Sequence, residues 1–294
     1  MSEGLFWHDL DDGITCIDAG YVADGVACFY LLGAGDDYAV IETGTGRSVD
    51  RLLQVLASRS IAQEQLRYII PTHVQLDHAG GAGAMAQCFP EAVVLAHPRG
   101  ARHLTDPARL VASAREVYGD AHFDRLYGTV APIAEARLRV VEDGERVLLG
   151  DRELVFRHTR GHADHHFCVW DSRSAGWFSG DMFGACYRWS RFDDAVYVLP
   201  TTTPTQFRPE AFLESIDLLA SYSPHRLFLT HFGELAYTAG AADGLRREIE
   251  AYAAIGERIG PDRAALEEAL WEHSLAALAR FPRAPARDRL MTLM

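Results

Sequence analysis

The chain has 294 residues, 48% of them hydrophobic and 23% charged, which is the composition of a globular protein with a sizeable core. Its formal net charge of -13 disfavours nucleic acid and anionic membrane surfaces as partners. All of the basic side chains other than histidine are arginines. The absence of lysine from the sequence excludes a lysine nucleophile, a Schiff base and a Walker P-loop.

The N-terminal segment and the cysteines indicate a cytoplasmic protein. Residues 1–12 are acidic and lack the basic stretch followed by an apolar one that marks a signal peptide. No apolar run approaches the length that spans a bilayer. The cysteines are scattered and form no C-x-x-C pair, so we expect reduced, mostly buried thiols.

The first part of the chain is predicted to form strands around one short helix. Runs of β-branched and aromatic residues, separated by Gly and Asp turns, indicate strands over residues 14–17, 26–32 and 38–42. The turn that begins at Glu42 then leads into the helix. A further short apolar run over residues 66–70 predicts a buried strand.

The stretch directly after that strand concentrates two imidazoles and a carboxylate in a tight turn. Nitrogen and oxygen ligands this close together suit a borderline metal such as zinc, or iron. Strand-like alternation would put His73, Gln75 and Asp77 on one side and His78 on the other. A loop with ordinary polar residues is the alternative interpretation.

Three further apolar runs end at residues of the metal-binding type. The runs at residues 153–158, 175–179 and 226–230 lead to a histidine, an aspartate and a histidine respectively. Loops at the ends of strands commonly carry functional groups, and four independent strand ends of this kind favour a metal site over chance. The three additional candidates are His162, Asp181 and His231.

The remaining segments predict helices and a second group of strands. Residues 99–137 are expected to form a helical insertion, packed on the core or placed as a lid over the metal cleft. Strands are expected over residues 137–158 and a long aromatic loop over residues 182–207. Two helices, 243–259 and 262–280, follow. Aromatic residues that form either core or a substrate wall are Tyr118, Tyr187, Trp189 and Tyr197.

The order and context of the candidate ligands resemble the metallo-β-lactamase superfamily over residues 25–235. That family's pattern is His-x-His-x-Asp-His after one strand, then a later His, an Asp and a final His. The resemblance implies a four-layer αββα sandwich of the α+β class with a C-terminal helical extension. We expect residues 1–240 to form this domain, with residues 99–137 inserted, and residues 241–294 to pack on it as helices. Gln75 departs from the pattern, because the family has its second His there.

The resemblance also implies a role for each candidate. The ligands would form two metal sites bridged by one aspartate. The first site would consist of His73, Gln75 and His162, and the second of Asp77, His78 and His231. Asp181 would be the bridge. Asp77 is also the candidate for orienting the nucleophile. Glu42 and His166 are expected to hold the ligands through hydrogen bonds. The carboxamide of Gln75 is a weaker zinc ligand than imidazole, so the site holds either two Zn²⁺ ions, one of them weakly, or a single ion. Iron and manganese are the alternative metals.

The activity that the resemblance implies is hydrolysis of an ester, thioester or lactone of a small molecule by metal-activated water. An iron-dependent oxidoreductase with the same ligands and a non-catalytic binding protein are the alternatives. The expected partner is therefore the small-molecule substrate, with the C-terminal helices as a candidate homodimer contact.

Overall fold

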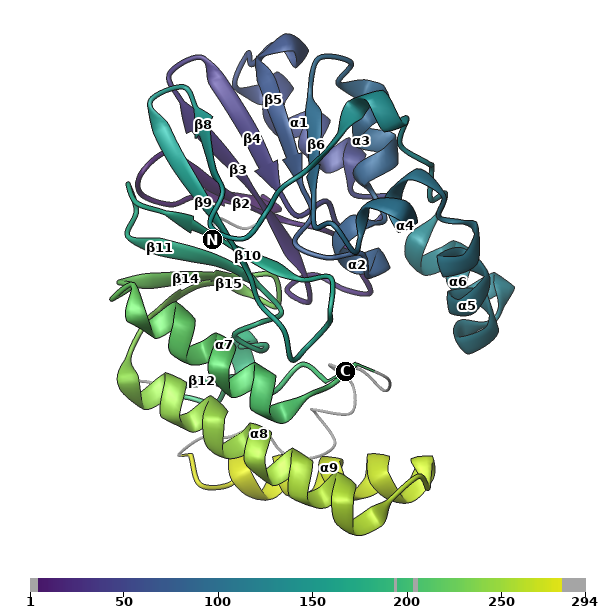
Figure 1. The fold of residues 1–294 in the computed structure, drawn as a ribbon, viewed down its shortest axis with the longest axis vertical. Helices are drawn as coiled ribbons and strands as arrows, with labels where there is room; N and C mark the ends of the chain where they lie inside the picture. The colour runs from purple at the N-terminus through teal and green to yellow at the C-terminus, as the bar shows by residue number, and fades with distance from the viewer. Residues whose placement is uncertain (1–4, 193–194, 203–205, 282–294) are drawn as a thin grey trace.

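The computed structural model describes residues 5–192, 195–202 and 206–281. Two large β-sheets lie face to face and helices cover their outer faces, so the predicted αββα arrangement is confirmed (Figure 1). A two-stranded ribbon lies outside both sheets and consists of β12 (Arg191–Phe192) and β13 (Ala195–Val196).

The first sheet has seven strands, which follow one another in chain order. Its first four strands form antiparallel neighbours, whereas the pairs from β4 to β7 are parallel. The strands are β1 (Trp7–Asp9), β2 (Ile14–Asp18), β3 (Cys28–Ala34), β4 (Asp37–Ile41), β5 (Leu66–Ile70), β6 (Val93–Ala96) and β7 (Leu138–Val140).

The second sheet has six strands in the order β15-β14-β11-β10-β9-β8. All of its neighbours are antiparallel except β11 and β14, which are parallel. The strands are β8 (Arg146–Leu149), β9 (Arg152–His158), β10 (Phe167–Asp171), β11 (Gly176–Gly180), β14 (Arg226–Leu229) and β15 (Gly233–Ala236).

The position of β7 corrects one expectation from the sequence. The pattern groups this strand with β8 and β9, but it pairs in parallel with β6 in the first sheet. Parallel neighbours need a long crossover connection, and the helical segment after β6 supplies it. An apolar run does not reveal which neighbour it pairs with, so the pattern alone could not place the strand. The crossover helices are α4 (Ala101–Thr105), α5 (Ala108–Tyr118) and α6 (Asp120–Tyr127).

Alternation along the strands divides the apolar side chains between layers. On β3, Phe29 packs against the outer helices, whereas Tyr30 faces the second sheet. The Tyr30 ring lies edge-on to Phe178 and Phe228, with centroid distances of 5.3 and 5.6 Å. Burial of these side chains in a layer between the sheets is the main stabilising contribution to the fold. The helices on the outer face of the first sheet are α1 (Val49–Ser58) and α3 (Ala82–Cys88).

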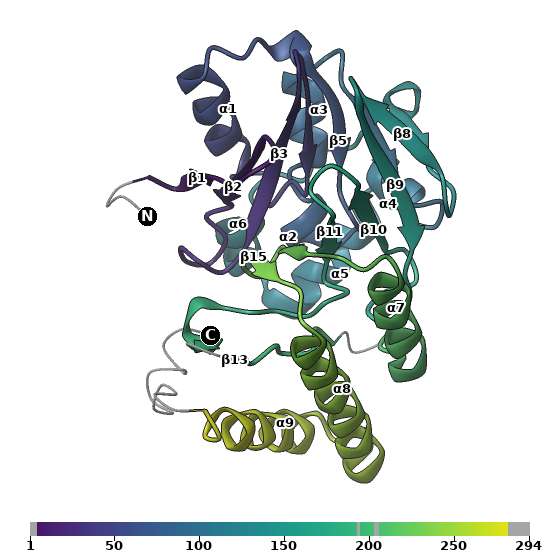
Figure 2. The same cartoon turned by 90° about the vertical axis from the view of Figure 1, so that its left-hand side faces the viewer.

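The outer face of the second sheet is covered by α7 and α8, through side chains such as Phe212 and Leu245. The last helix, α9, lies on the far side of α8 from α7 (Figure 2). Its Leu278 packs with Tyr197 and its neighbours. Within the described part of the chain, no helix has the length and apolar character to cross a membrane. These helices are α7 (Pro209–Ser221), α8 (Ala239–Ile259) and α9 (Arg263–Leu278), and the 3₁₀ turns are η1 (Gln63–Gln65), η2 (Glu135–Arg137) and η3 (Arg188–Ser190).

The two sheets are joined by backbone hydrogen bonds at the edge where β5 and β14 end. The Phe167 N–H donates to the Thr72 carbonyl at 3.0 Å, and the Cys28 N–H donates to the Thr230 carbonyl at 2.9 Å. Thr72 and Thr230 directly precede His73 and His231 in the chain. The sheet packing therefore fixes the backbone of both segments that carry these histidines.

Candidate metal centre

The turn after β5 contains a short helix, α2 (Leu76–Ala79), with Gln75 at its N-terminal boundary. The alternation expected for residues 73–78 is therefore wrong, because the backbone becomes helical at Leu76. As a result, His78 turns to the same side as His73, and their ring centroids lie 4.0 Å apart. A tight turn thus delivers both imidazoles to one place.

The predicted ligands form two adjoining groups that share a boundary at Asp181. In each group the ligand atoms lie within 4.8 Å of one another. Asp181 Oδ1 lies 3.4 Å from His78 Nε2 and 3.5 Å from His231 Nε2, while its Oδ2 lies 3.4 Å from His162 Nε2. One carboxylate therefore faces both groups. The first group consists of His73, His162 and Asp181, and the second group consists of Asp77, His78 and His231.

Each histidine of the two groups is held through its Nδ1 atom. The Nδ1 atoms of His162 and His231 contact the carbonyls of Thr201 and Val26, both at 2.9 Å. His73 Nδ1 lies 3.1 Å from the Thr72 hydroxyl. A carbonyl partner fixes Nδ1 as the protonated nitrogen and leaves the Nε2 lone pair for a ligand.

Several atoms at the centre of the groups are buried without a hydrogen-bond partner in the part of the chain that the structure describes. They include His73 Nε2, His78 Nε2 and Asp181 Oδ1. Buried polar atoms are normally paired, and an exception requires a physical reason. A cation bound by these nitrogen and oxygen atoms would satisfy them, and such a donor set suits zinc. The residues therefore fit a metal centre.

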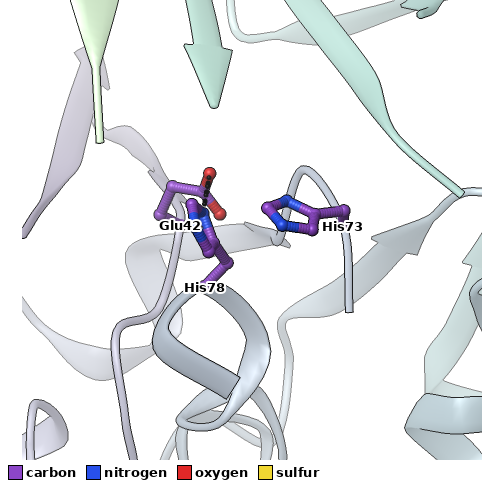
Figure 3. A group of neighbouring side chains, drawn as sticks. All are labelled: Glu42, His73 and His78. Carbon is purple, nitrogen blue, oxygen red and sulfur yellow. Dashed lines mark hydrogen bonds and ion pairs between the residues drawn. The ribbon is translucent and has the colours of Figure 1, made fainter. Parts of the chain in front are cut away.

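Glu42 forms hydrogen bonds with residues that adjoin or belong to the two groups of ligands. Its buried carboxylate accepts hydrogen bonds from the Thr72 N–H at 3.1 Å, the Thr72 hydroxyl at 2.6 Å and the Thr230 hydroxyl at 3.0 Å. It also accepts from His78 Nδ1 at 2.9 Å, the contact drawn in Figure 3. Glu42, His73 and His78 also form a group in which one ligand atom of each residue lies within 4.8 Å of the others. Because its oxygens are occupied by these donors, we interpret Glu42 as holding the ligand turn.

His166 contacts the backbone of Asp181. The Asp181 N–H donates to His166 Nε2 at 3.2 Å, and His166 Nδ1 lies 2.8 Å from the Thr159 hydroxyl. With Nε2 accepting, Nδ1 carries the proton and donates to Thr159. His166 therefore orients Asp181 and has no nitrogen left for a metal.

Gln75 lies at the start of α2, is half-buried, and its side chain makes no hydrogen bond to the described residues. The first group therefore consists of two imidazoles and the shared carboxylate. The weaker first site predicted from the sequence stays a prediction.

Replacing Gln75 with histidine is expected to tighten binding at the first group by about tenfold or more, because imidazole is a better zinc ligand than a carboxamide. Competition against a chelator, read as metal ions per protein, measures the change. Gln54→His on the exposed face of α1 controls for adventitious binding by an added histidine. Equal metal content in Gln75→His and the parent would refute the weak-site interpretation.

Negative charge around the centre governs the protonation of its histidines. Burial lowers the pKa of His78, but Asp181, Glu42 and Asp77 outweigh it and raise the pKa to about 9. Burial also lowers the pKa of His231, but Asp181 and Asp77 outweigh it and raise the pKa well above the ordinary value. Burial and neighbouring histidines lower the pKa of His73. The metal-free centre thus holds protons at neutral pH where a cation would bind.

Metal binding at neutral pH is therefore expected to release protons, about one from each of the two histidines with a raised pKa. Their pKa values lie above neutral, so protons compete with metal and apparent affinity should rise with pH up to about 9. Zinc titration of metal-free protein in a weakly buffered indicator solution measures the release. The His78→Ala variant should release about one proton fewer than the parent. Release that is the same in both proteins would contradict this assignment.

The predicted pocket residues occupy different environments. Tyr187 lies beside the centre, with its ring centroid 6.5 Å from that of His231, and it stacks on Trp189 at 5.4 Å. Tyr118 is exposed on α5. Tyr197 is buried, and its hydroxyl donates to a carboxylate oxygen of Glu248 at 3.0 Å. Tyr187 is therefore the aromatic residue of this set nearest to the candidate ligands.

Threonines around the centre were missed by sequence reasoning. Thr72 and Thr230 adjoin candidate ligands in the sequence, so their positions could have indicated a supporting role. Thr201 had no such signal, because its partner His162 lies 39 residues away. Thr159 is likewise distant from the aspartate that its contact with His166 supports. These contacts depend on how the strand ends meet.

The family of the chain follows from this fold and donor set together with a family comparison. A model of the metallo-beta-lactamase superfamily matches residues 23–231, which is most of the chain and includes both metal-binding groups. The protein belongs to the metallo-beta-lactamase superfamily. The resemblance inferred from the sequence is confirmed.

Individual relatives agree with this membership. The metallo-beta-lactamase fold-containing protein ST1585 of Sulfurisphaera tokodaii is 27% identical over 205 residues, which cover 67% of this chain and 74% of the relative. The acyl-coenzyme A thioesterase MBLAC2 of Homo sapiens is 28% identical over 213 residues, which cover 65% of this chain and 74% of the relative.

Solved structures show the same fold. The crystal structure of ST1585 from Sulfolobus tokodaii matches with a TM-score of 0.65 and 24% identity, over 83% of this chain and 87% of that chain. The metallo-beta-lactamase family protein TTHA1429 from Thermus thermophilus matches with a TM-score of 0.61 and 22% identity, over 83% of this chain and 81% of that chain.

Proposed function

We propose that this protein is a metal-dependent hydrolase of small-molecule esters, with an acyl thioester as the preferred substrate class. The observation that carries the proposal is the position of the Asp181 carboxylate, whose two oxygens lie 3.4 Å from His78 Nε2 and from His162 Nε2 in the two groups of buried ligands. The activity named for MBLAC2, an acyl-coenzyme A thioesterase, supports the choice of a thioester over other bonds.

The residues that would hold the metal are the members of the two groups around Asp181. A divalent metal bound there would lower the pKa of a bound water to about 7 and polarise the substrate carbonyl. Zinc agrees best with the mixture of imidazole and carboxylate ligands, and iron and manganese are also compatible with this ligand set. The negative charge of the acidic residues at the centre favours a dication over a neutral ligand.

The protein side chains contribute positioning and charge. Asp77 Oδ2 lies 3.5 Å from His231 Nε2 and 3.8 Å from His78 Nε2, so its carboxylate belongs to the second group. Burial raises the pKa of Asp77, but His78 and His231 outweigh it and keep the pKa well below the ordinary value. Asp77 therefore stays ionised and can accept a hydrogen bond from the attacking water, which orients the water toward the substrate carbonyl.

A panel of acyl thioesters, oxoesters and lactones, assayed with zinc-loaded and manganese-loaded protein, tests the proposal. We expect turnover of thioesters that disappears when the metal is removed by a chelator and returns when it is restored. Absence of hydrolysis across the panel with metal bound would overturn the proposal. Oxygen consumption by the iron-loaded protein, without hydrolysis, would favour the oxidoreductase alternative instead.

A further inference from the structure

A chamber of about 330 Å³ lies between α9 and the segment that runs from Trp189 to Thr202. Its volume falls within the range of small-molecule sites, which are mostly apolar with a few polar groups. Trp271 contributes a buried indole Nε1 with no acceptor among the residues that the structure describes. Apolar residues of its wall are Trp189, Leu199, Leu270, Trp271, Leu275 and Leu278.

The segment that lines the chamber also touches the metal centre. The Thr201 carbonyl accepts from His162 Nδ1 at 2.9 Å, and the Thr201 hydroxyl donates to the Asp181 carbonyl at 2.6 Å. The residues on either side of Thr201, Pro200 and Thr202, line the chamber. The stretch of residues 200–202 therefore both lines the chamber and holds the ligand His162.

A second connection runs through the stacked pair Tyr187 and Trp189. The Tyr187 ring lies beside His231 of the second group, and Trp189 forms part of the chamber wall. Tyr187 thus links the chamber wall to the second group of ligands. A second cavity, beside α4, has about 10 Å³ and holds no more than a water molecule.

We propose that the chamber binds the apolar acyl chain of the substrate, which places the carbonyl at the metal centre and the chain against α9. This inference rests on the proposed function and adds the substrate class, a thioester of a medium-length acyl chain. The physical reason is that each methylene moved from water onto the apolar side chains of the chamber wall favours binding. An acetyl group, which has no chain to bury, gains nothing from the chamber.

Rates of hydrolysis of acetyl and decanoyl thioesters of N-acetylcysteamine test the inference. In the parent, kcat/KM for the decanoyl thioester should exceed that for the acetyl thioester by about tenfold or more, because chain burial favours the longer substrate. Leu270→Trp narrows the chamber and should lower this ratio by about tenfold. Leu266→Trp is the matched control, because Leu266 is equally half-buried on α9 but does not line the chamber. Equal ratios in both variants would overturn the inference.

A binding measurement separates failure of the chamber from failure of the proposed function. Calorimetric titration with 1-octanol, an uncharged alkyl probe, should show one site in the parent and in Leu266→Trp. The site should be lost in Leu270→Trp and in Thr202→Trp, whose exposed position on the chamber wall makes misfolding a minor concern. Octanol binding without thioester hydrolysis would contradict the proposed function but support the chamber. Hydrolysis at rates that do not depend on chain length, together with no octanol binding, would overturn the assignment of the chamber but not the proposed function.

Discussion

Asp181→Asn is expected to lower kcat/KM for thioester hydrolysis by about 1,000-fold, because the charge shared by both groups of ligands is lost. Asn has nearly the same shape as Asp, so packing is preserved, but its neutral amide is a poor bridge between two cations. The expected bridging role is inferred from the three distances of 3.4 to 3.5 Å from its oxygens to His78, His162 and His231. Metal content should fall together with activity.

The control for this variant is Asp164→Asn. Asp164 lies in the same loop as His162 but pairs with Arg99 and Arg208 and belongs to neither group of ligands. It should retain both metal and activity. If Asp181→Asn kept its full metal content and lost less than about tenfold in kcat/KM, the bridging role assigned to this carboxylate would be untenable.

Glu42→Ala is expected to destabilise the metal-free protein by about 3–5 kcal/mol, the cost of removing a buried charged partner from its donors. Its carboxylate accepts from Thr72, Thr230 and His78, and alanine leaves all of these donors unpaired. His78 would also lose the contact that fixes its tautomer, so metal affinity should fall by about 10–100-fold. Urea unfolding of the metal-free protein measures the first effect.

Two variants make the Glu42 result interpretable. Glu42→Asp keeps the charge but shortens the side chain by one methylene, so its free energy of unfolding should fall between those of the parent and Glu42→Ala. Glu64→Ala, at an exposed position in η1, should change stability by less than about 0.5 kcal/mol. A Glu42→Ala protein as stable as Glu64→Ala would mean that the hydrogen bonds of Glu42 do not hold the turn together.

The layers of the fold and the clustering of ligands could be predicted from the sequence because both depend on local signals. Strand ends that carry His73, His162, Asp181 and His231 are recognisable as apolar runs followed by polar turns, and the family pattern supplied their order. The structure brings these residues together around Asp181. The parallel segments of the two sheets explain why strand ends distant in the sequence meet at one edge.

Other features depended on long-range pairing that no local pattern encodes. The pairing of β7 with β6 follows from a crossover of about forty residues. The short helix at Leu76 reversed the expected direction of His78, because four residues are too few for a helical period to show. Thr201 and the chamber beside α9 depend on contacts between the 189–202 segment and the rest of the chain.

Anomalous X-ray diffraction from crystals of the zinc-loaded protein, recorded on both sides of the zinc absorption edge, tests the metal centre most directly. We expect anomalous density on each side of the Asp181 carboxylate, one peak bound by His78 and His231 and a weaker one near His73 and His162. Zinc peaks confined to the protein surface, with no density between these side chains, would contradict the assignment of a metal centre.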